Sequence, residues 1–325
     1  MKSTRAILRQ HGGPEVIEWL EEDLPAPGPD EVTLEHGAVG LNYIDTYHRR
    51  GIYPVALPSG LGIEAAGRVV AVGERVEGFA EGDRVATFGP LLGAYSTHRN
   101  IGAEHLFRLP DGIDDRTAAA SIVKAFTAEF LAERCGKVEK SWPVLVHAAA
   151  GGTGLLLTQW LNHLGAEVIG TVSTEEKAEA ARAAGAHHVI FYKEENTAER
   201  VREITGGDGV RVTFDGIGRS TWETSLDATG KRGLIINYGN ADAPVGELDV
   251  GVLAMKGSFY NTRPMLFHYY EDTQERAECS ARVWDLFKHG VLSVTIGQTY
   301  PLTEAAQAHT DLQAGKTTGS TVLLP

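Results

Sequence analysis

The hydrophobic and polar positions of this chain follow one pattern before about residue 115 and another after it. Up to about residue 100, short segments alternate between apolar and polar residues, as in Glu31–His36, Gly67–Gly73 and Asp83–Phe88. Glycines separate these segments. Short alternating segments with closely spaced turn signals predict an antiparallel, barrel-like unit of β-strands.

Beyond residue 115, apolar segments alternate with helical patterns. An alanine-rich stretch from Asp115 to about Cys135 predicts a helix, and a last strand is expected at Thr321–Leu324. Further helices are predicted at Thr153–His163, around Lys177–Ala181, through Trp284–Phe287 and from a cap at Thr303. Five strands are predicted at Pro143–His147, Glu167–Val172, His188–Phe191, Val210–Asp215 and Gly233–Asn237. Strands that alternate with helices form βαβ units, so the predicted fold class is α/β with a doubly wound parallel sheet.

Composition narrows the functional classes. The 325 residues suggest two domains, and 42% hydrophobic residues suffice for two cores. A formal net charge of −13 argues against nucleic-acid binding, which needs clustered Lys and Arg. Two cysteines, Cys135 and Cys279, are too few for a disulfide scaffold or a four-cysteine zinc site, and they fit a reducing compartment. Neither a signal peptide nor a membrane-spanning apolar run is recognisable, so a cytoplasmic location is expected.

The segment His147–Leu155 connects a predicted strand to a predicted helix and is rich in glycine. Gly151 would let the backbone approach a pyrophosphate, and Gly154 would let the helix pack against the strand. The first glycine of the G-x-G-x-x-G pattern is here Ala149. An ordinary tight turn is the alternative, but the four following strands favour dinucleotide binding. The predicted contacts are Ala150, Gly151, Gly152, Thr153 and Gly154.

The end of the second strand of this unit distinguishes NAD from NADP. An NAD enzyme would place Asp or Glu there, whereas this chain has Val172-Ser173-Thr174, followed by Lys177. A hydroxyl and a nearby cation suit the 2′-phosphate of NADPH, which a carboxylate would repel. The alternative for Lys177 is a solvated helix residue. The sequence therefore favours NADPH as the cofactor.

Several segments carry a family resemblance: Gly40–Tyr47, Gly51–Pro54, Leu57–Gly67, the glycine-rich loop and Lys256–Ser258. Through them the chain resembles the quinone oxidoreductases, the zeta-crystallin-like, zinc-independent group of the medium-chain dehydrogenase/reductase superfamily. The resemblance implies a GroES-like β-barrel catalytic domain and a Rossmann domain that binds NADPH. The expected boundaries are residues 1–122 and 263–325 for the first domain and 123–262 for the second.

The resemblance also bears on metal binding. Zinc alcohol dehydrogenases of the superfamily carry Gly-His-Glu where this chain has Gly62-Ile63-Glu64, and a cysteine ligand where Asn42 stands. Because the usual His and Cys ligands are missing, no zinc is expected. Without a metal to polarise a carbonyl, an acceptor that is already activated is favoured, such as a quinone or a conjugated enone.

Site residues follow from the resemblance. Asn42, Tyr47 and Tyr53 are expected to face the nicotinamide and to be catalytic, with loop packing as the alternative for the tyrosines. Cofactor contacts are expected at Thr127, Ser173, Lys177, Tyr192, Tyr238, Gly239, Asn240, Ser258 and Phe259. Tyr238 and Phe259 would equally suit a core. Lys316 stands near a position where some relatives have arginine.

The leading functional hypothesis is an NADPH-dependent quinone reductase, which converts NADPH and a quinone to NADP+ and a semiquinone or hydroquinone. A zinc-independent reductase of α,β-unsaturated ketones or aldehydes is the alternative enzyme. A binding protein is the third hypothesis, since relatives of this fold serve as lens crystallins or bind RNA. The strand expected at Lys256–Asn261 resembles the edge through which the family forms homodimers, so a homodimer is expected.

Overall fold

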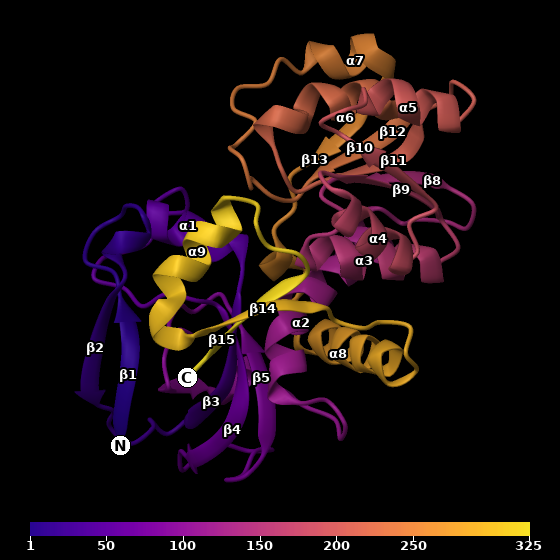
Figure 1. Cartoon of the computed structure of the whole chain (residues 1–325). Coiled ribbons are helices and arrows are strands. Elements are labelled where there is room, and N and C mark those ends of the chain that lie inside the picture. Colours follow the sequence, from indigo (N-terminus) through magenta and orange to yellow (C-terminus); the bar gives the residue numbers. More distant parts are fainter. The chain divides into compact units, whose positions relative to one another are not determined.

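A computed structural model describes all residues from Met1 to Pro325 (Figure 1). The chain forms two compact units. Unit 1 consists of Met1–Val123 and Val294–Pro325, and unit 2 consists of Lys124–Ser293. No helix in either unit has the length and apolar character needed to cross a membrane.

Unit 1 is built around a seven-stranded sheet in which β3 (Glu31–Leu41) is the central strand. The strand order is β14 (Ile296–Pro301), β15 (Ser320–Leu324), β3, β4 (Glu64–Val72), β5 (Arg84–Phe88) and β7 (Leu106–Arg108). One side of β3 pairs with β4, while β6 (His98–Gly102) and β15 share the other side. All pairs except β14–β15 are antiparallel, which confirms the predicted β-strand unit.

Helices α1 and α9, the start of α2 (Asp115–Glu129) and a separate two-stranded ribbon complete unit 1. The ribbon pairs β1 (Lys2–Ile7) with β2 (Glu18–Asp23). Helix α1 (Tyr43–Arg50) begins directly after β3, where Asn42 is its N-cap, and ends at Gly51, whose φ of 73° is left-handed. Helix α9 (Ala305–Gln313) lies beside α1 (Figure 1).

Unit 2 is the predicted doubly wound parallel sheet. Its order is β10 (His188–Phe191), β9 (Glu167–Val172), β8 (Pro143–Val146), β11 (Val210–Asp215), β12 (Thr229–Asn237) and β13 (Tyr260–Thr262). All neighbours are parallel. The chain leaves the first strand, β8, in one direction and later returns to its other side, so the strand order reverses between β8 and β11. Ligands of such sheets bind outside the carboxyl ends of the strands at this reversal.

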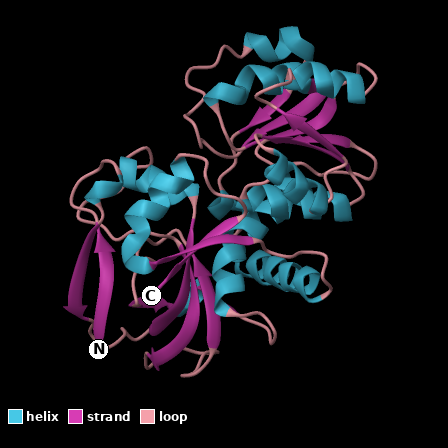
Figure 2. Ribbon diagram, viewed as in Figure 1, coloured by secondary structure: helices cyan, strands magenta, loops and turns pink.

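Helices cover both faces of this sheet (Figure 2). Helices α3 (Gly152–His163) and α4 (Glu175–Ala183) lie on one face. The other face carries α5 (Thr197–Ile204), α6 (Trp222–Ala228) and α7 (Gly251–Gly257). The inner strands β8, β9, β11 and β12 are mostly buried, which explains their nearly continuous apolar sequences.

Three parts of the chain differ from the predicted elements. The expected strand at Lys256–Asn261 is shorter: α7 extends to Gly257, Ser258 ends it with a left-handed φ of 57°, and β13 begins at Tyr260. The expected helix to Cys135 is α2 (Asp115–Glu129) followed by a π-helical segment at Phe130–Cys135. Helix α1 was not predicted, because its eight residues are too few to show a clear apolar periodicity.

The return of the chain to unit 1 also comes later than the predicted residue 263. The segment before Ser293 packs on unit 2, where the Tyr270 hydroxyl donates to Phe126 O at 2.8 Å. Helix α8 (Thr273–Lys288) adds the ion pair of Arg282 with Glu133, and Gln159 bonds to the backbone of Ser293. These contacts place residues 263–293 with unit 2, so the unit border falls at Ser293.

Candidate functional site

The glycine-rich loop of unit 2 connects β8 to α3. Ala148 has a left-handed φ of 52°, and the turn is closed by a bond from Gly151 N to Ala148 O at 3.0 Å. Gly151 is the N-cap of α3. A Cβ built on Gly154 would stand 2.3 Å from Ala148 O, so only glycine lets α3 pack this closely on the strand end. The backbone N–H groups at the start of α3 form an anion-binding end next to Gly151, which has no side chain.

Buried polar side chains hold the strand ends beneath this loop. The Ser225 hydroxyl donates to Asp215 Oδ2 at 2.7 Å, and it lies 3.1 Å from His147 Nε2. Because that hydroxyl proton is used, His147 Nε2–H donates to Ser225, and Thr171 Oγ1 lies 3.4 Å from Nδ1. Burial lowers the pKa of His147, which agrees with this neutral tautomer. The network joins the ends of β8, β9 and β11.

Two lysines lie at the ends of β9 and β10. Thr174 caps α4 by accepting from Lys177 N at 3.4 Å, so Lys177 lies in the first turn of the helix that follows Ser173. Partial burial lowers the pKa of Lys177, and the charge of Lys193 lowers it further. Lys193 follows Tyr192, whose N–H donates to Val172 O at 3.2 Å and so fixes the two strand ends side by side. This pair of cations suits a doubly charged phosphate group.

The carboxyl end of β12 carries Tyr238, Gly239 and Asn240. A Cβ on Gly239 would stand 2.3 Å from Gly216 O, so the ends of β11 and β12 approach each other closely here. Hydrogen bonding orients the Asn240 amide with its nitrogen donating to Gly239 O at 2.8 Å and its oxygen accepting from Arg263 Nη2 at 3.2 Å. Asn240 is buried, so this pair gives a fixed polar end to the strand.

The remaining predicted contacts of unit 2 differ in exposure. Thr127 is half-buried on α2, and Ser258 is exposed at the end of α7. Phe259 is 7% exposed and packs with Trp222, Leu226 and Ile235, so its ring has a core position.

In unit 1, Asn42 is fixed by a buried carboxylate. Asn42 Nδ2 donates to Glu64 Oε2 at 2.7 Å, and Val123 N donates to Glu64 Oε1 at the same distance. Glu64 is fully buried on β4 and so joins α1, β4 and α2. An amide nitrogen carries two hydrogens, so this bond fixes the direction of the second N–H of Asn42.

A chain of buried side chains continues from Asn42 to α9. Arg49 Nη1 lies 2.9 Å from His309 Nδ1, and Arg49 also donates to Gln313 Oε1 at 2.7 Å. A guanidinium only donates, so His309 carries its proton on Nε2, which lies 2.9 Å from the Tyr95 oxygen. The Tyr95 hydroxyl then donates to Asp45 Oδ2 at 3.1 Å, and the same oxygen accepts from Asn42 N at 2.9 Å.

Tyr47 and Tyr53 form an aromatic pair next to this chain. Their ring centroids lie 5.3 Å apart in an edge-to-face arrangement. Tyr47 is 4% exposed on α1, and Tyr53 is half-buried in the loop after it. The structure thus brings the three predicted catalytic residues together around α1. Lys316, on the same unit, lies 3.3 Å from Asp311.

The residues at the former ligand positions do not suit zinc. Ile63 has no donor atom, and Asn42 is bonded to Glu64. No group of three or more His, Cys, Asp or Glu side chains is arranged to hold a metal ion.

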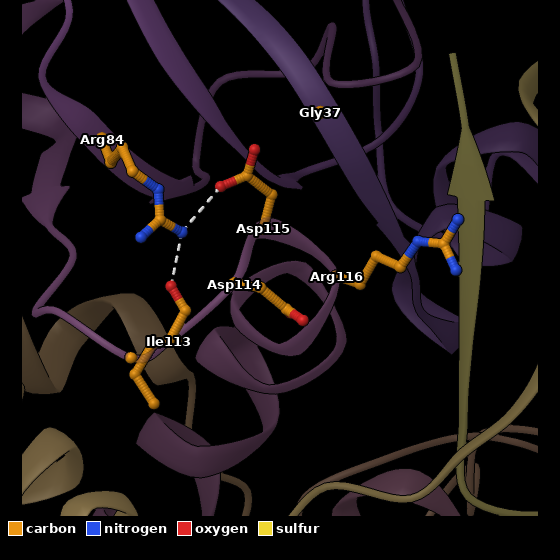
Figure 3. Close-up of a pocket in the computed structure, with 7 residues that line it drawn as sticks. Gly37, Arg84, Ile113, Asp114, Asp115 and Arg116 are labelled. Atoms are coloured by element: carbon orange, nitrogen blue, oxygen red, sulfur yellow. Dashed lines mark hydrogen bonds and ion pairs between the residues drawn. The ribbon is translucent and has the colours of Figure 1, made fainter.

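A pocket of about 540 Å³ opens in unit 1 at the start of α2 (Figure 3). Arg84 donates there to Ile113 O and to Asp115, 3.0 Å away, and so fastens α2 to the sheet. None of the predicted site residues lines this pocket. The candidate site therefore lies at the strand ends and around α1.

Sequence reasoning missed several residues of these two regions: Glu64, Tyr95, His309, Lys193 and Arg263. Lys193 was detectable, because it follows the predicted contact Tyr192 at a strand end. Tyr95 and His309, which connect Asp45 to Arg49, come from distant parts of the chain, so no local sequence pattern predicts their contact.

Comparison with known proteins defines the class first. Residues 28–111 match the model of the alcohol dehydrogenase GroES-like domain, and residues 152–276 match the model described as zinc-binding dehydrogenase. The quinone oxidoreductase of Pseudomonas aeruginosa is 48% identical over 99% of both chains. The chain belongs to the quinone oxidoreductase family of the medium-chain dehydrogenase/reductase superfamily.

Two further relatives are informative. The crystal structure of Escherichia coli quinone oxidoreductase complexed with NADPH has a TM-score of 0.97 and 45% identity, and covers 99% of this chain and 100% of that one. The 2-haloacrylate reductase of a Burkholderia species is 45% identical over 98% of both chains. The fold predicted from the sequence is confirmed by these matches.

Proposed function

We propose that this protein is an NADPH-dependent quinone reductase. The observation that carries the proposal is the arrangement of Ser173, Lys177 and Lys193 at the ends of β9 and β10, beside the glycine-rich loop. The loop and the start of α3 would bind the pyrophosphate, and the two lysines would bind the 2′-phosphate. The similarity to the Escherichia coli enzyme complexed with NADPH supports this reading.

The nicotinamide supplies the hydride when NADPH is bound, and the chain supplies binding and orientation. On unit 2, Thr127, Ser258 and the Tyr238–Asn240 strand end are the proposed nicotinamide-side contacts. On unit 1, the second N–H of Asn42 would donate to the acceptor oxygen as negative charge develops on it. The half-buried ring of Tyr53 offers a surface against which a flat acceptor can pack, and the buried ring of Tyr47 supports it edge-to-face.

A second candidate function is reduction of an activated carbon–carbon double bond. The relative named 2-haloacrylate reductase favours it, because a 2-haloacrylate carries a double bond conjugated to a carboxylate. The same residues would serve either acceptor, since both develop negative charge on an oxygen.

The deciding experiment is a steady-state assay that compares NADPH with NADH, using an ortho-quinone, a para-quinone and a simple enone. Lys177→Ala and Lys193→Ala should each lower kcat/KM for NADPH about tenfold, the loss of roughly one charge-assisted contact, and leave NADH unchanged. Lys231→Ala is the matched control, because Lys231 is exposed at the other end of β12. Preference for NADH would contradict the cofactor assignment, and fast turnover of the enone with inert quinones would favour the second candidate.

The proposed working form is a cytoplasmic homodimer. Both cysteines are free, which fits a reducing compartment. Strand β13 is the edge of the unit 2 sheet, and exposed Tyr260 lies on it. An open edge strand with an apolar side chain favours pairing with a second copy.

A further inference from the structure

Arg99 is a buried cation without a counter-charge. It lies on β6, and only 8% of the residue is exposed. Its Nε–H is fully enclosed and has no hydrogen-bond partner. Burial is the only influence that shifts its pKa, which falls to about 10, so no carboxylate compensates the charge and the guanidinium remains protonated at neutral pH.

Arg99 lies beside apolar residues of the sheet and near one buried histidine. Arg99 pairs with Leu34 of β3, which belongs to a core cluster with Val69, Val85 and Ile101. His36 lies two residues beyond Leu34 and so projects from the same face of the sheet, diagonal to Arg99. Both side chains are buried inside the strand unit.

His36 cannot supply the missing negative charge. Its Nδ1 lies 2.7 Å from Ser96 O, and because a carbonyl only accepts, Nδ1 carries the proton. Burial and the charge of Arg99 lower the pKa of His36 to about 3, so the ring is neutral. Its Nε2 is an enclosed acceptor without a partner. The pair therefore lacks an acceptor for Arg99 and a donor for His36.

A water molecule alone satisfies only part of this need. Water can accept from Arg99 Nε and donate to His36 Nε2, but it leaves a buried positive charge uncompensated. Buried charges in proteins are paired, because an isolated charge is costly in a medium of low dielectric constant. A guanidinium without a partner in a folded protein therefore points to an ion.

The space beside the guanidinium suits a small ion. A Cβ built on Gly93 would stand 3.9 Å from Arg99 Nη1, so the backbone of Gly93 lies next to the guanidinium without a side chain of its own. Nε is the enclosed nitrogen of Arg99, whereas the terminal nitrogens are not enclosed, so they are the atoms that an ion can reach.

We propose that Arg99 binds a small monovalent anion of chloride size on its terminal nitrogens, at an interior site of unit 1 beside His36 and Gly93. The site is separate from the proposed function: Leu34 and Arg99 lie near the start of β3, whereas Asn42 follows the end of that strand. The anion would stabilise the fold of unit 1 and take no part in the reaction.

Two measurements on the full chain test the site. Crystals grown in sodium bromide should show an anomalous peak in contact with the Arg99 guanidinium. In solution, replacing sodium gluconate with sodium chloride at constant ionic strength should raise the Tm by about 2–4 °C, because the small anion binds only the folded state. Arg99→Met should abolish this response, since it removes the charge and keeps the length of the side chain.

Arg84→Met is the matched control, because Arg84 is paired with Asp115 and its loss should leave the chloride response intact. Equal chloride responses in the wild type and in Arg99→Met would overturn the proposal, as would density for water alone between Arg99 and His36 in the bromide crystals. If Arg99→Met does not fold, the bromide position in wild-type crystals decides the question.

Discussion

The direction of each hydrogen bond between Arg49 and Asp45 follows from the chemistry of single groups. Arg49 only donates, so His309 must accept at Nδ1 and donate at Nε2, and Tyr95 must donate onward to Asp45. Burial and the neighbouring Arg49 lower the pKa of His309 to about 3, which keeps the ring in this one neutral tautomer. A proton added at Nδ1 would break the hydrogen bond with Arg49. Acid would therefore remove a contact that holds α1 against α9.

This gives a prediction for stability against pH. The folded pKa of His309 is about 3 and the reference value is 6.5, so between these values the unfolded chain binds a proton that the folded chain does not. The free energy of unfolding should therefore fall as pH decreases below about 6.5, by about 1.4 kcal/mol per pH unit for this residue. Urea titrations between about pH 7 and pH 5 measure the slope.

His309→Gln should flatten that slope, because the glutamine amide can accept from Arg49 and donate to Tyr95 without titrating. The slope that remains includes His36, whose pKa is lowered in the same way. His289→Gln, at an exposed position, is the control. An unchanged slope in His309→Gln would contradict the assignment.

Single residues were predictable from the sequence where a local pattern defines them. The glycine loop, Ser173 and Lys177 follow from their distance to predicted strand ends. Glu64 and His309 could not be found in this way, because their partners depend on which strands and helices meet in unit 1. The role of Asn42 as N-cap of α1 became visible only with the helix itself.

At the scale of elements, the β8–α3 connection assigns different roles to two glycines. Gly154 lies where the helix touches the strand end, and a Cβ there would meet the backbone of Ala148 and Ala149 at 2.3–2.9 Å. Gly151 has only Ala148 O nearby, at 3.3 Å, and an ordinary φ of −74°. Gly154 therefore determines how closely the helix packs on the strand, and Gly151 determines what can approach the helix N-terminus.

Alanine substitutions should separate these roles. Gly154→Ala should lower the free energy of unfolding by about 1–3 kcal/mol, because backbone atoms cannot move aside as a flexible side chain can. Gly151→Ala should cost little stability but weaken NADPH binding about tenfold, since its methyl group occupies the approach of the pyrophosphate. Denaturation curves and NADPH fluorescence titrations of both variants make the comparison. Equal losses of stability in the two variants would show that the glycines have the same role.

The elements themselves were largely predictable, and the exceptions have physical reasons. The boundaries of β9, β10 and β11 agree with the predicted ones. For β9 and β11 the reason is burial, because mostly buried strands need nearly uninterrupted apolar residues. Residues 256–261 were expected to form one strand, but Ser258 adopts a left-handed conformation and separates α7 from β13. A left-handed serine carries no sequence signal comparable to that of glycine.

At the scale of the whole molecule, exposed apolar side chains gather on one stretch of unit 2. Four of the eight exposed large hydrophobic residues fall within residues 250–265: Val250, Met255, Tyr260 and Met265. They belong to α7, β13 and the flanking segments, next to the open edge of the sheet. Concentrated apolar exposure of this kind marks a surface that contacts another protein.

The same stretch leads to the prediction on assembly. Each chain carries a net charge of −13, so two copies repel each other and association must rely on apolar contact and strand pairing. Light scattering should give twice the mass of one chain. The dissociation constant of the dimer should fall as added salt screens the repulsion between the two chains. Tyr260→Glu and Met255→Glu should shift the protein toward monomer, because each adds charge to the proposed contact. Leu91→Glu, at an exposed position in unit 1, is the control and should leave the mass unchanged. A monomeric wild type would contradict the predicted dimer, and equal dissociation in all three variants would contradict the location of the contact.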